Sequence, residues 1–116
     1  PVVREGDEEW ADIVAWTLYA QKEAEEYGLN SGNAGQMRNN PKSNPTVKRL
    51  LGVEGNTGEH LGLGNDWAYN VISMIGNYGE MYERHVGLNT PLQLQREGSP
   101  NALWTKGGLH YPMPFR

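Results

Sequence analysis

Three histidines are the side chains best suited to bind a metal or transfer protons, and they stand far apart, at positions 60, 85 and 110. No two of them have the spacing of a zinc motif such as H-x-x-x-H or H-E-x-x-H. His85 falls late in a predicted helix, where the helix dipole favours the protonated ring. A pH-sensitive role for His85 is therefore an alternative, but we favour an ordinary surface histidine. The spacing predicts no metal site.

Motifs for nucleophilic catalysis and phosphate binding are also missing from the sequence. The glycine-rich stretch 52–64 resembles a phosphate-binding loop, but it lacks G-x-x-x-x-G-K-[ST] and no strand leads into it. There is no G-x-S-x-G elbow and no cysteine. Neighbouring carboxylates such as Glu8 and Glu9 point in different directions on a helix. We therefore predict that the chain is not an enzyme, with no catalytic residue and no cofactor.

The chain has four tryptophans and six tyrosines. An aromatic surface that binds a carbohydrate or another ligand is therefore an alternative. Trp10 and Trp67 lie on apolar helical faces, so we expect both in the core. Trp16 and Tyr19 fall off the main apolar stripe of their helix. We expect these two to contact something outside this segment.

The elements that position these side chains are predominantly helices. The first begins near residue 8, with Asp7 as the N-cap and Gly28 as the stop. Its apolar side chains recur at spacings of three, four and seven, which places them on one face: Trp10, Ile13, Val14, Thr17, Leu18 and Ala24. Its carboxylates are predicted to form a solvated outer face: Glu8, Asp12, Glu23, Glu25 and Glu26.

The middle of the chain alternates loops with short helices. Residues 30–45 are rich in Asn, Ser, Gly and Pro, which predicts a loop with at most one helical turn around 36–38. Asn44-Pro45 starts a two-turn helix that ends at Gly52. One further turn is expected to end at Leu61-Gly62. A second strong helical pattern covers 66–86, either as one broken helix or as two that meet at Gly76-Asn77.

The two ends of the chain are not helical in this interpretation. Residues 1–4 are prone to form a short strand, residues 101–104 favour one turn, and the prolines in 109–116 predict an extended tail. The predicted fold is therefore mainly α, with one short N-terminal strand and a long extended C-terminal tail. Loops this long count against residues 1–116 being a complete domain.

Composition limits the size and the partners of the chain. At 116 residues it forms one domain at most. A net charge of −4 offers no basic patch for nucleic acid. No apolar run approaches the roughly 18 residues of a membrane span, so we expect no membrane insertion. The first residue is Pro1, which fits a mature product or an excised piece.

Several stretches of the chain resemble the general L-amino-acid-binding periplasmic proteins of ABC transporters. The resemblance runs in consistent order over essentially all 116 residues, and it is carried by residues 1–14, 50–55, 61–72, 76–84 and 101–116. It implies a periplasmic, two-lobed α/β protein that closes on an amino acid and delivers it to a membrane permease. Residues 1–116 match the C-terminal helical part of lobe one. Gln21-Lys22 depart from the family's apolar pattern, and the loop 33–42 is unusual.

The same resemblance implies that the ligand-clamping residues precede Pro1, so the ligand-binding residues within this chain are unknown. We expect the amino-acid-binding and delivery component of an uptake transporter, without a complete ligand site. The alternative is a stand-alone, self-associating structural module with no ligand. In the isolated chain the face of Trp10, Ile13 and Val14 lacks the sheet that would cover it. We therefore expect a dimer or a swapped oligomer.

Overall fold

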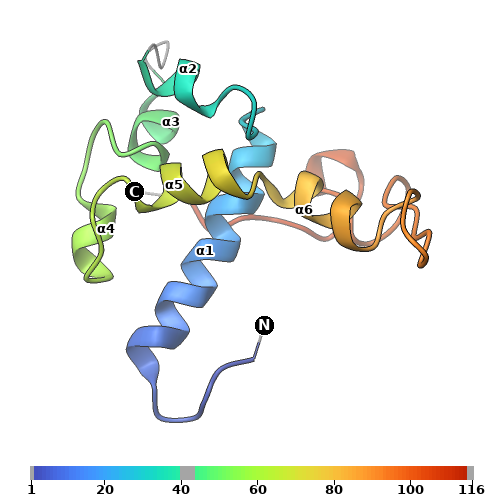
Figure 1. Cartoon of the computed structure of the whole chain (residues 1–116), viewed down its shortest axis with the longest axis horizontal. Helices are drawn as coiled ribbons and strands as arrows, with labels where there is room; N and C mark the ends of the chain where they lie inside the picture. The colour runs from blue at the N-terminus through green and yellow to red at the C-terminus, as the bar shows by residue number, and fades with distance from the viewer. Residues whose placement is uncertain (1, 40–43, 115–116) are drawn as a thin grey trace.

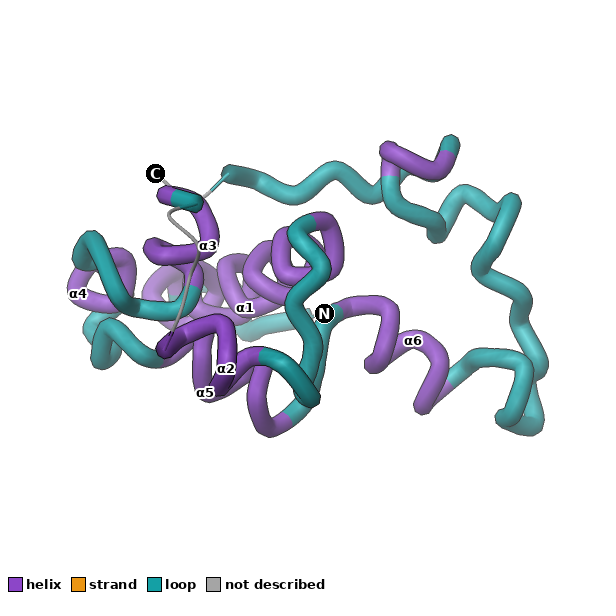
Figure 2. Tube along the Cα trace, turned by 90° about the horizontal axis from the view of Figure 1, so that it is seen from above, coloured by secondary structure: helices purple, strands orange, loops and turns teal. Residues whose placement is uncertain are grey.

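The regular structure of the chain is helical in the computed structural model, which describes residues 2–39 and 44–114. Figures 1 and 2 show helices joined by long loops, and within the described ranges no strand forms. The mainly helical prediction is thus confirmed. The elements are α1 (Glu8–Glu26), α2 (Ala34–Asn39), α3 (Pro45–Leu50), α4 (Thr57–His60), α5 (Trp67–Met74), α6 (Tyr78–His85) and the 3₁₀ helix η1 (Trp104–Lys106).

Helix α1 begins and ends where local sequence signals predict. The Asp7 side chain accepts a hydrogen bond from the Trp10 N–H at 3.2 Å, which satisfies one free donor of the first turn. At the other end Gly28 takes φ +74°, and the N–H of Leu29 donates to the Ala24 carbonyl at 2.8 Å. Leu29 is then fully buried. This is the glycine-terminated helix end expected at Gly28.

The short helices of the middle section also follow the predictions. Asn44 caps α3 by accepting from the N–H groups of Thr46 and Val47. Helix α3 stops before Gly52, whose φ is +78° and whose missing side chain leaves room for the Asn65 carbonyl. Helix α4 ends before Gly62. Helix α2 lies where at most one turn around 36–38 was expected in the loop 30–45, but it is longer than predicted and extends over six residues. Residues 40–43 of that loop lie outside the described residues.

The second helical pattern splits into α5 and α6 at the Gly76-Asn77 junction. Gly76 takes φ +105°, and Asn77 forms a reciprocal capping box with Glu80. The buried Gln21 of α1 donates from Nε2 to the Gly76 carbonyl at 3.2 Å. A carbonyl freed by a helix break needs a donor when it is buried. This contact explains why a polar residue stands where an apolar one is expected.

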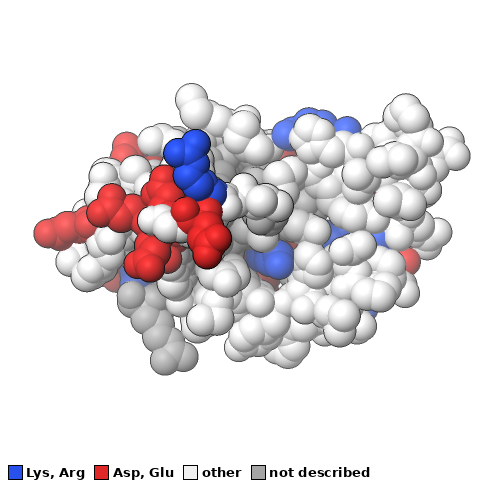
Figure 3. Space-filling model, turned by 90° about the horizontal axis from the view of Figure 1, so that it is seen from below, with Lys and Arg blue, Asp and Glu red and all other residues white. Residues whose placement is uncertain are grey.

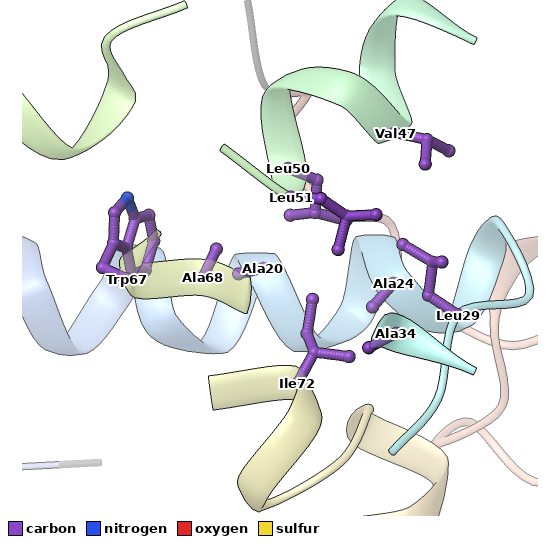
Figure 4. Packing of buried hydrophobic residues seen from close by; sticks show 10 residues of the cluster. All are labelled: Ala20, Ala24, Leu29, Ala34, Val47, Leu50, Leu51, Trp67, Ala68 and Ile72. Atoms are coloured by element: carbon purple, nitrogen blue, oxygen red, sulfur yellow. The ribbon is translucent and has the colours of Figure 1, made fainter. Parts of the chain in front are cut away.

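The core lies between the C-terminal half of α1 and helices α2, α3 and α5. Helix α1 contacts α3, α5 and α6, and α2 contacts α5. The small side chains at four core positions allow the helices to approach closely. Trp67 is buried there, as predicted. Figure 4 shows the cluster, which consists of Ala20, Ala24, Leu29, Ala34, Val47, Leu50, Leu51, Trp67, Ala68 and Ile72.

The N-terminal segment and the turn near residue 103 differ from the prediction. The N-terminal strand is not observed: residues 2–4 have no regular structure and Val2 is 99% exposed. A strand needs a neighbour for its backbone hydrogen bonds, and the described residues provide none. The turn expected at 101–104 forms instead as η1, because Leu103 is held in an isolated parallel bridge with His110.

The C-terminal tail has neither helix nor strand over residues 111–114. Its extended course stays a prediction, and residues 115–116 and Pro1 lie outside the described part of the chain. In residues 2–39 and 44–114, no helix has both the length and the apolar character that crossing a bilayer requires.

Candidate functional site

The apolar face of α1 is uncovered along the N-terminal half of the helix. Figure 1 shows this half extending away from the other helices. Trp10 is 52% exposed. An apolar groove of about 310 Å³ follows the helix and reaches α6 at Met81. We call it the α1 groove, lined by Trp10, Ile13, Val14, Thr17, Leu18, Gln21 and Met81.

A second apolar hollow adjoins the α1 groove on the same helix. It has about 200 Å³ and shares Val14 and Leu18 with the groove. Val3, from the segment before the helix, lines its far side. The two hollows together form a continuous apolar surface, and contiguous exposed apolar surface marks an interaction site.

The carboxylates that begin α1 form a charged edge beside this apolar surface. Glu8, Glu9 and Asp12 are exposed, and Figure 3 shows acidic side chains gathered on the side of the molecule where α1 begins. The predicted solvated face is therefore confirmed in this half of the helix. It is wrong further along: Glu23 is only 2% exposed, and Glu25 is partly buried.

The α1 aromatics follow the predictions only in part. Trp10 was expected in the core and is exposed, on the face that the resemblance predicted to lack its covering sheet in this chain. Trp16 and Tyr19 were expected to contact something outside this segment. Both are partly buried and pack against the core in an edge-to-face pair with ring centroids 5.3 Å apart, and Tyr19 also lines the second apolar hollow. The reason is that the other helices meet the side of α1 that carries Trp16, Tyr19 and Ala20.

A second cluster of functional groups surrounds Arg96, in the long loop after α6. The guanidinium makes two hydrogen bonds to the Glu25 carboxylate of α1, one of them at 2.6 Å. It also lies 5.0 Å from the centroid of the Tyr78 ring, and its Nε donates to the Asn101 carbonyl at 2.9 Å. The donors of Arg96 are therefore directed at protein groups, and the cluster holds the loop to α1 and α6.

The Arg96 cluster borders a polar hollow of about 450 Å³. Charges of both signs surround it, so it favours neither an anion nor a cation. We therefore regard it as part of the loop attachment. Its lining consists of Glu25, Glu83, Arg96, Glu97, Gly98, Ala102, Leu103 and Lys106.

The structure keeps the three histidines separate. His60 shares a small hollow with Glu9 and Asp12, His85 is exposed at the end of α6, and His110 lies against Tyr78. Among the described residues, no three side chains of the metal-binding types come together to hold an ion.

Glu80 joins the start of α6 to the loop after α1. Its carboxylate accepts from the Ser31 N–H at 2.9 Å and the Ser31 hydroxyl at 2.5 Å. Partial burial works to raise the pKa of Glu80, but the hydrogen bonds from Ser31 and Asn77 outweigh burial and lower it below its usual 4.5.

Replacing Glu80 with glutamine should therefore cost stability in a pH-dependent way. A carboxyl group whose pKa is lowered by folding stabilises the folded chain when the pH is above the pKa that the group has in the unfolded chain. This stabilisation is lost as the pH falls through the pKa of the folded chain. We expect the Glu80→Gln variant to lose about 1 kcal/mol of unfolding free energy at pH 7, and this loss should become smaller below pH ~4.5. Urea unfolding at pH 7 and pH 3 measures it, with the exposed Glu83→Gln as control. An equal loss at both pH values would contradict this assignment.

The sequence of this chain has relatives among known proteins. No family model matches it. It is 52% identical over 118 residues to the general L-amino-acid-binding periplasmic protein AapJ of Rhizobium johnstonii. It is 49% identical over 116 residues to the putative amino-acid ABC transporter-binding protein YhdW of Escherichia coli K12. This chain is homologous to amino-acid-binding proteins of ABC transporters.

The homology extends over the whole of this chain but only 33% of each of these two relatives. The chain therefore spans about a third of the length of the curated relatives it matches. A solved ABC-transporter periplasmic binding protein from Brucella ovis, with glutathione bound, has a TM-score of 0.87 and 47% identity. It matches 98% of this chain, which corresponds to 35% of the Brucella protein. The predicted resemblance is confirmed.

Most residues of the α1 groove are predictable from the sequence, but two that line it, Gln21 and Met81, are not. The stripe from Trp10 to Leu18 follows from helical spacing. Met81 falls within the helical pattern 66–86, and its spacing relates it only to its own helix. Gln21 stands out in the sequence only as a departure from the family pattern. Their polar and apolar contacts join residues about 55–60 positions apart, so local spacing carries no signal for them.

Proposed function

We propose that this chain is the C-terminal helical part of lobe one of a periplasmic amino-acid-binding protein that serves an ABC uptake transporter. The observation that carries the proposal is the uncovered α1 groove. It occurs in a chain that matches only about a third of the length of its binding-protein relatives. In this view the rest of the binding protein covers the groove. The chain itself holds no complete ligand site, and a membrane permease receives the ligand.

Burial of the α1 groove supplies the free energy for this packing. Each large apolar side chain moved from water into a protein interior contributes about 1.5–3 kcal/mol. Trp10, Ile13 and Leu18 line the groove from one helix, and Met81 extends it to α6. A packed partner therefore fixes both helices at once. A partner sheet with an apolar face fits this surface, because helices bury an apolar stripe against a sheet in α/β proteins.

The relatives support a class of ligand for the whole protein. AapJ is a general L-amino-acid-binding protein, and the Brucella protein holds glutathione. Glutathione carries an α-amino and an α-carboxyl group at one end, as free amino acids do. We therefore assign the whole protein a ligand with these two groups. Relatives of this kind are transport proteins, which favours a transport role over catalysis.

Split-protein complementation tests the proposal. Residues 1–116 are produced together with the two thirds of AapJ that this chain does not match. We expect the two pieces to copurify and to bind L-amino acids. Ile13→Asp places a charge in the α1 groove and should abolish copurification, because a buried unpaired carboxylate costs several kcal/mol. Asp12→Asn, one position away and exposed, is the matched control. Copurification that Ile13→Asp leaves unchanged would overturn the proposal.

Thermal melting of residues 1–116 alone tests whether the ligand site is complete. We expect no change in melting temperature with millimolar L-amino acids. A ligand at a hundred times its dissociation constant would add about 2.7 kcal/mol, or several degrees for a domain of this size. Such a shift would show a site within this chain.

The alternative, a self-associating module, uses the same exposed groove. It predicts a melting temperature that rises with protein concentration and a chain that does not bind the AapJ piece. Melts at two protein concentrations, together with the complementation experiment, distinguish the two functions.

A further inference from the structure

His110 packs its ring against α6 in a partly buried position. The His110 and Tyr78 ring centroids are 4.6 Å apart, with the ring planes tilted by 46°. The Nδ1 atom of His110 is buried and has no hydrogen-bond partner among the described residues. A neutral ring with its proton on Nε2 tolerates this position, because Nδ1 is then a bare acceptor.

The charged groups around His110 are mostly cationic. Lys22 of α1 lies 5.7 Å from the Tyr78 centroid, and Arg96 lies 5.0 Å from the same ring. The nearby carboxylate, Glu25, has both oxygens engaged by Arg96. Burial first, and then the charges of Lys22 and Arg96, lower the pKa of His110, while Glu25 acts in the opposite direction.

The backbone of His110 closes the loop that contains η1. Its carbonyl accepts from the Trp104 N–H at 2.9 Å, and its N–H donates to the Ala102 carbonyl at 3.2 Å. The Leu109 N–H donates to the Pro100 carbonyl at 2.8 Å. A displacement of the His110 ring from Tyr78 would therefore weaken these three hydrogen bonds, which close the loop of residues 100–110.

We propose that His110 is an acid-sensitive latch, whose protonation loosens the loop 100–110 from α1 and α6. Protonation would place a buried N–H at Nδ1 without an acceptor. It would also add a positive charge near Lys22 and Arg96, which both lie against the ring of Tyr78. The folded chain therefore binds this proton less readily than the unfolded chain. The stabilisation by the neutral ring is present above the unfolded pKa of about 6.5 and is lost as the pH falls from there toward the folded pKa.

Amide hydrogen exchange on the full chain tests the latch. Protection of the Trp104, Gly108 and His110 amides, corrected for intrinsic rates, should fall by roughly threefold or more between pH 7.5 and pH 5. The amides of α3 should keep their protection. His110→Phe preserves an aromatic ring on Tyr78 but cannot titrate, so its loop should lose this pH dependence. His85→Gln, at an exposed histidine, should behave as the wild type.

Two further measurements keep the proposal testable if the phenylalanine variant is perturbed. Lys22→Met removes one facing cation and should reduce the fall in protection. Titration of the His110 ring by NMR should give a midpoint below 6.5 in the folded chain. A midpoint at or above that value, unchanged protection in the wild type, or an equal fall in the His110→Phe chain would overturn the latch.

Discussion

Replacing Ile72 with alanine should lower the free energy of unfolding by about 2–5 kcal/mol. Ile72 is fully buried in the core cluster between α1, α2 and α5. The truncation removes three methyl or methylene groups from the interior and leaves a cavity that the neighbouring helices fill only in part. The contact of α1 with α5 is then weakened, and this contact fixes the direction in which the α1 groove projects.

Met74→Ala is the matched control for this experiment. Met74 belongs to the same helix, two positions away, but is 79% exposed. Its truncation should change the unfolding free energy by no more than about 0.5 kcal/mol. Urea denaturation followed by tryptophan fluorescence measures both variants. Similar losses at the two positions would show that α5 does not pack as described.

The second large effect is expected for Arg96→Met, with a loss of about 2–3 kcal/mol. The side chains of Arg96 and Glu25 are only 13% and 18% exposed. Removing the guanidinium leaves the Glu25 carboxylate largely buried without its bidentate partner, and also removes the cation from the Tyr78 ring. The loss is smaller than for a fully buried pair, because water still reaches part of Glu25.

Lys106→Met controls for the change of charge, since Lys106 is exposed and borders the same hollow. It should leave stability within about 0.5 kcal/mol of the wild type. Combining Arg96→Met with Glu25→Gln should recover part of the loss, because the second change removes the stranded charge. A double variant that loses the sum of the single effects would argue against a direct pair.

Helix ends were predictable because their signals are local. Asp7 and Asn44 cap the N–H groups two or three residues ahead of them. Gly28 and Gly52 adopt the positive φ that ends a helix. Gly76-Asn77 likewise combines a positive φ with a capping box, which separates α5 from α6. Each of these features depends on residues within one helical turn, so the printed order of residues is sufficient to locate it.

The long-range polar contacts had no such signal. Arg96 and Glu25 are separated by 71 positions, and Gln21 and Gly76 by 55. Glu25 was predicted as part of a solvated face, and Gln21 as a departure from the family pattern. Neither residue type nor spacing identifies such a partner, because the pairing depends on where the loop after α6 returns to α1.

The order of residues is enough to place the helix ends, the apolar stripe of α1 and, through resemblance, the relation to amino-acid-binding proteins. Which side of α1 is buried depends instead on how the helices pack. Trp16 and Tyr19 pack inward while Trp10 lines the open groove. A helical period places residues on common faces, but the burial of a face depends on the helices that reach it. In this chain α3, α5 and α6 contact α1 and leave the stripe from Trp10 to Leu18 as an open groove.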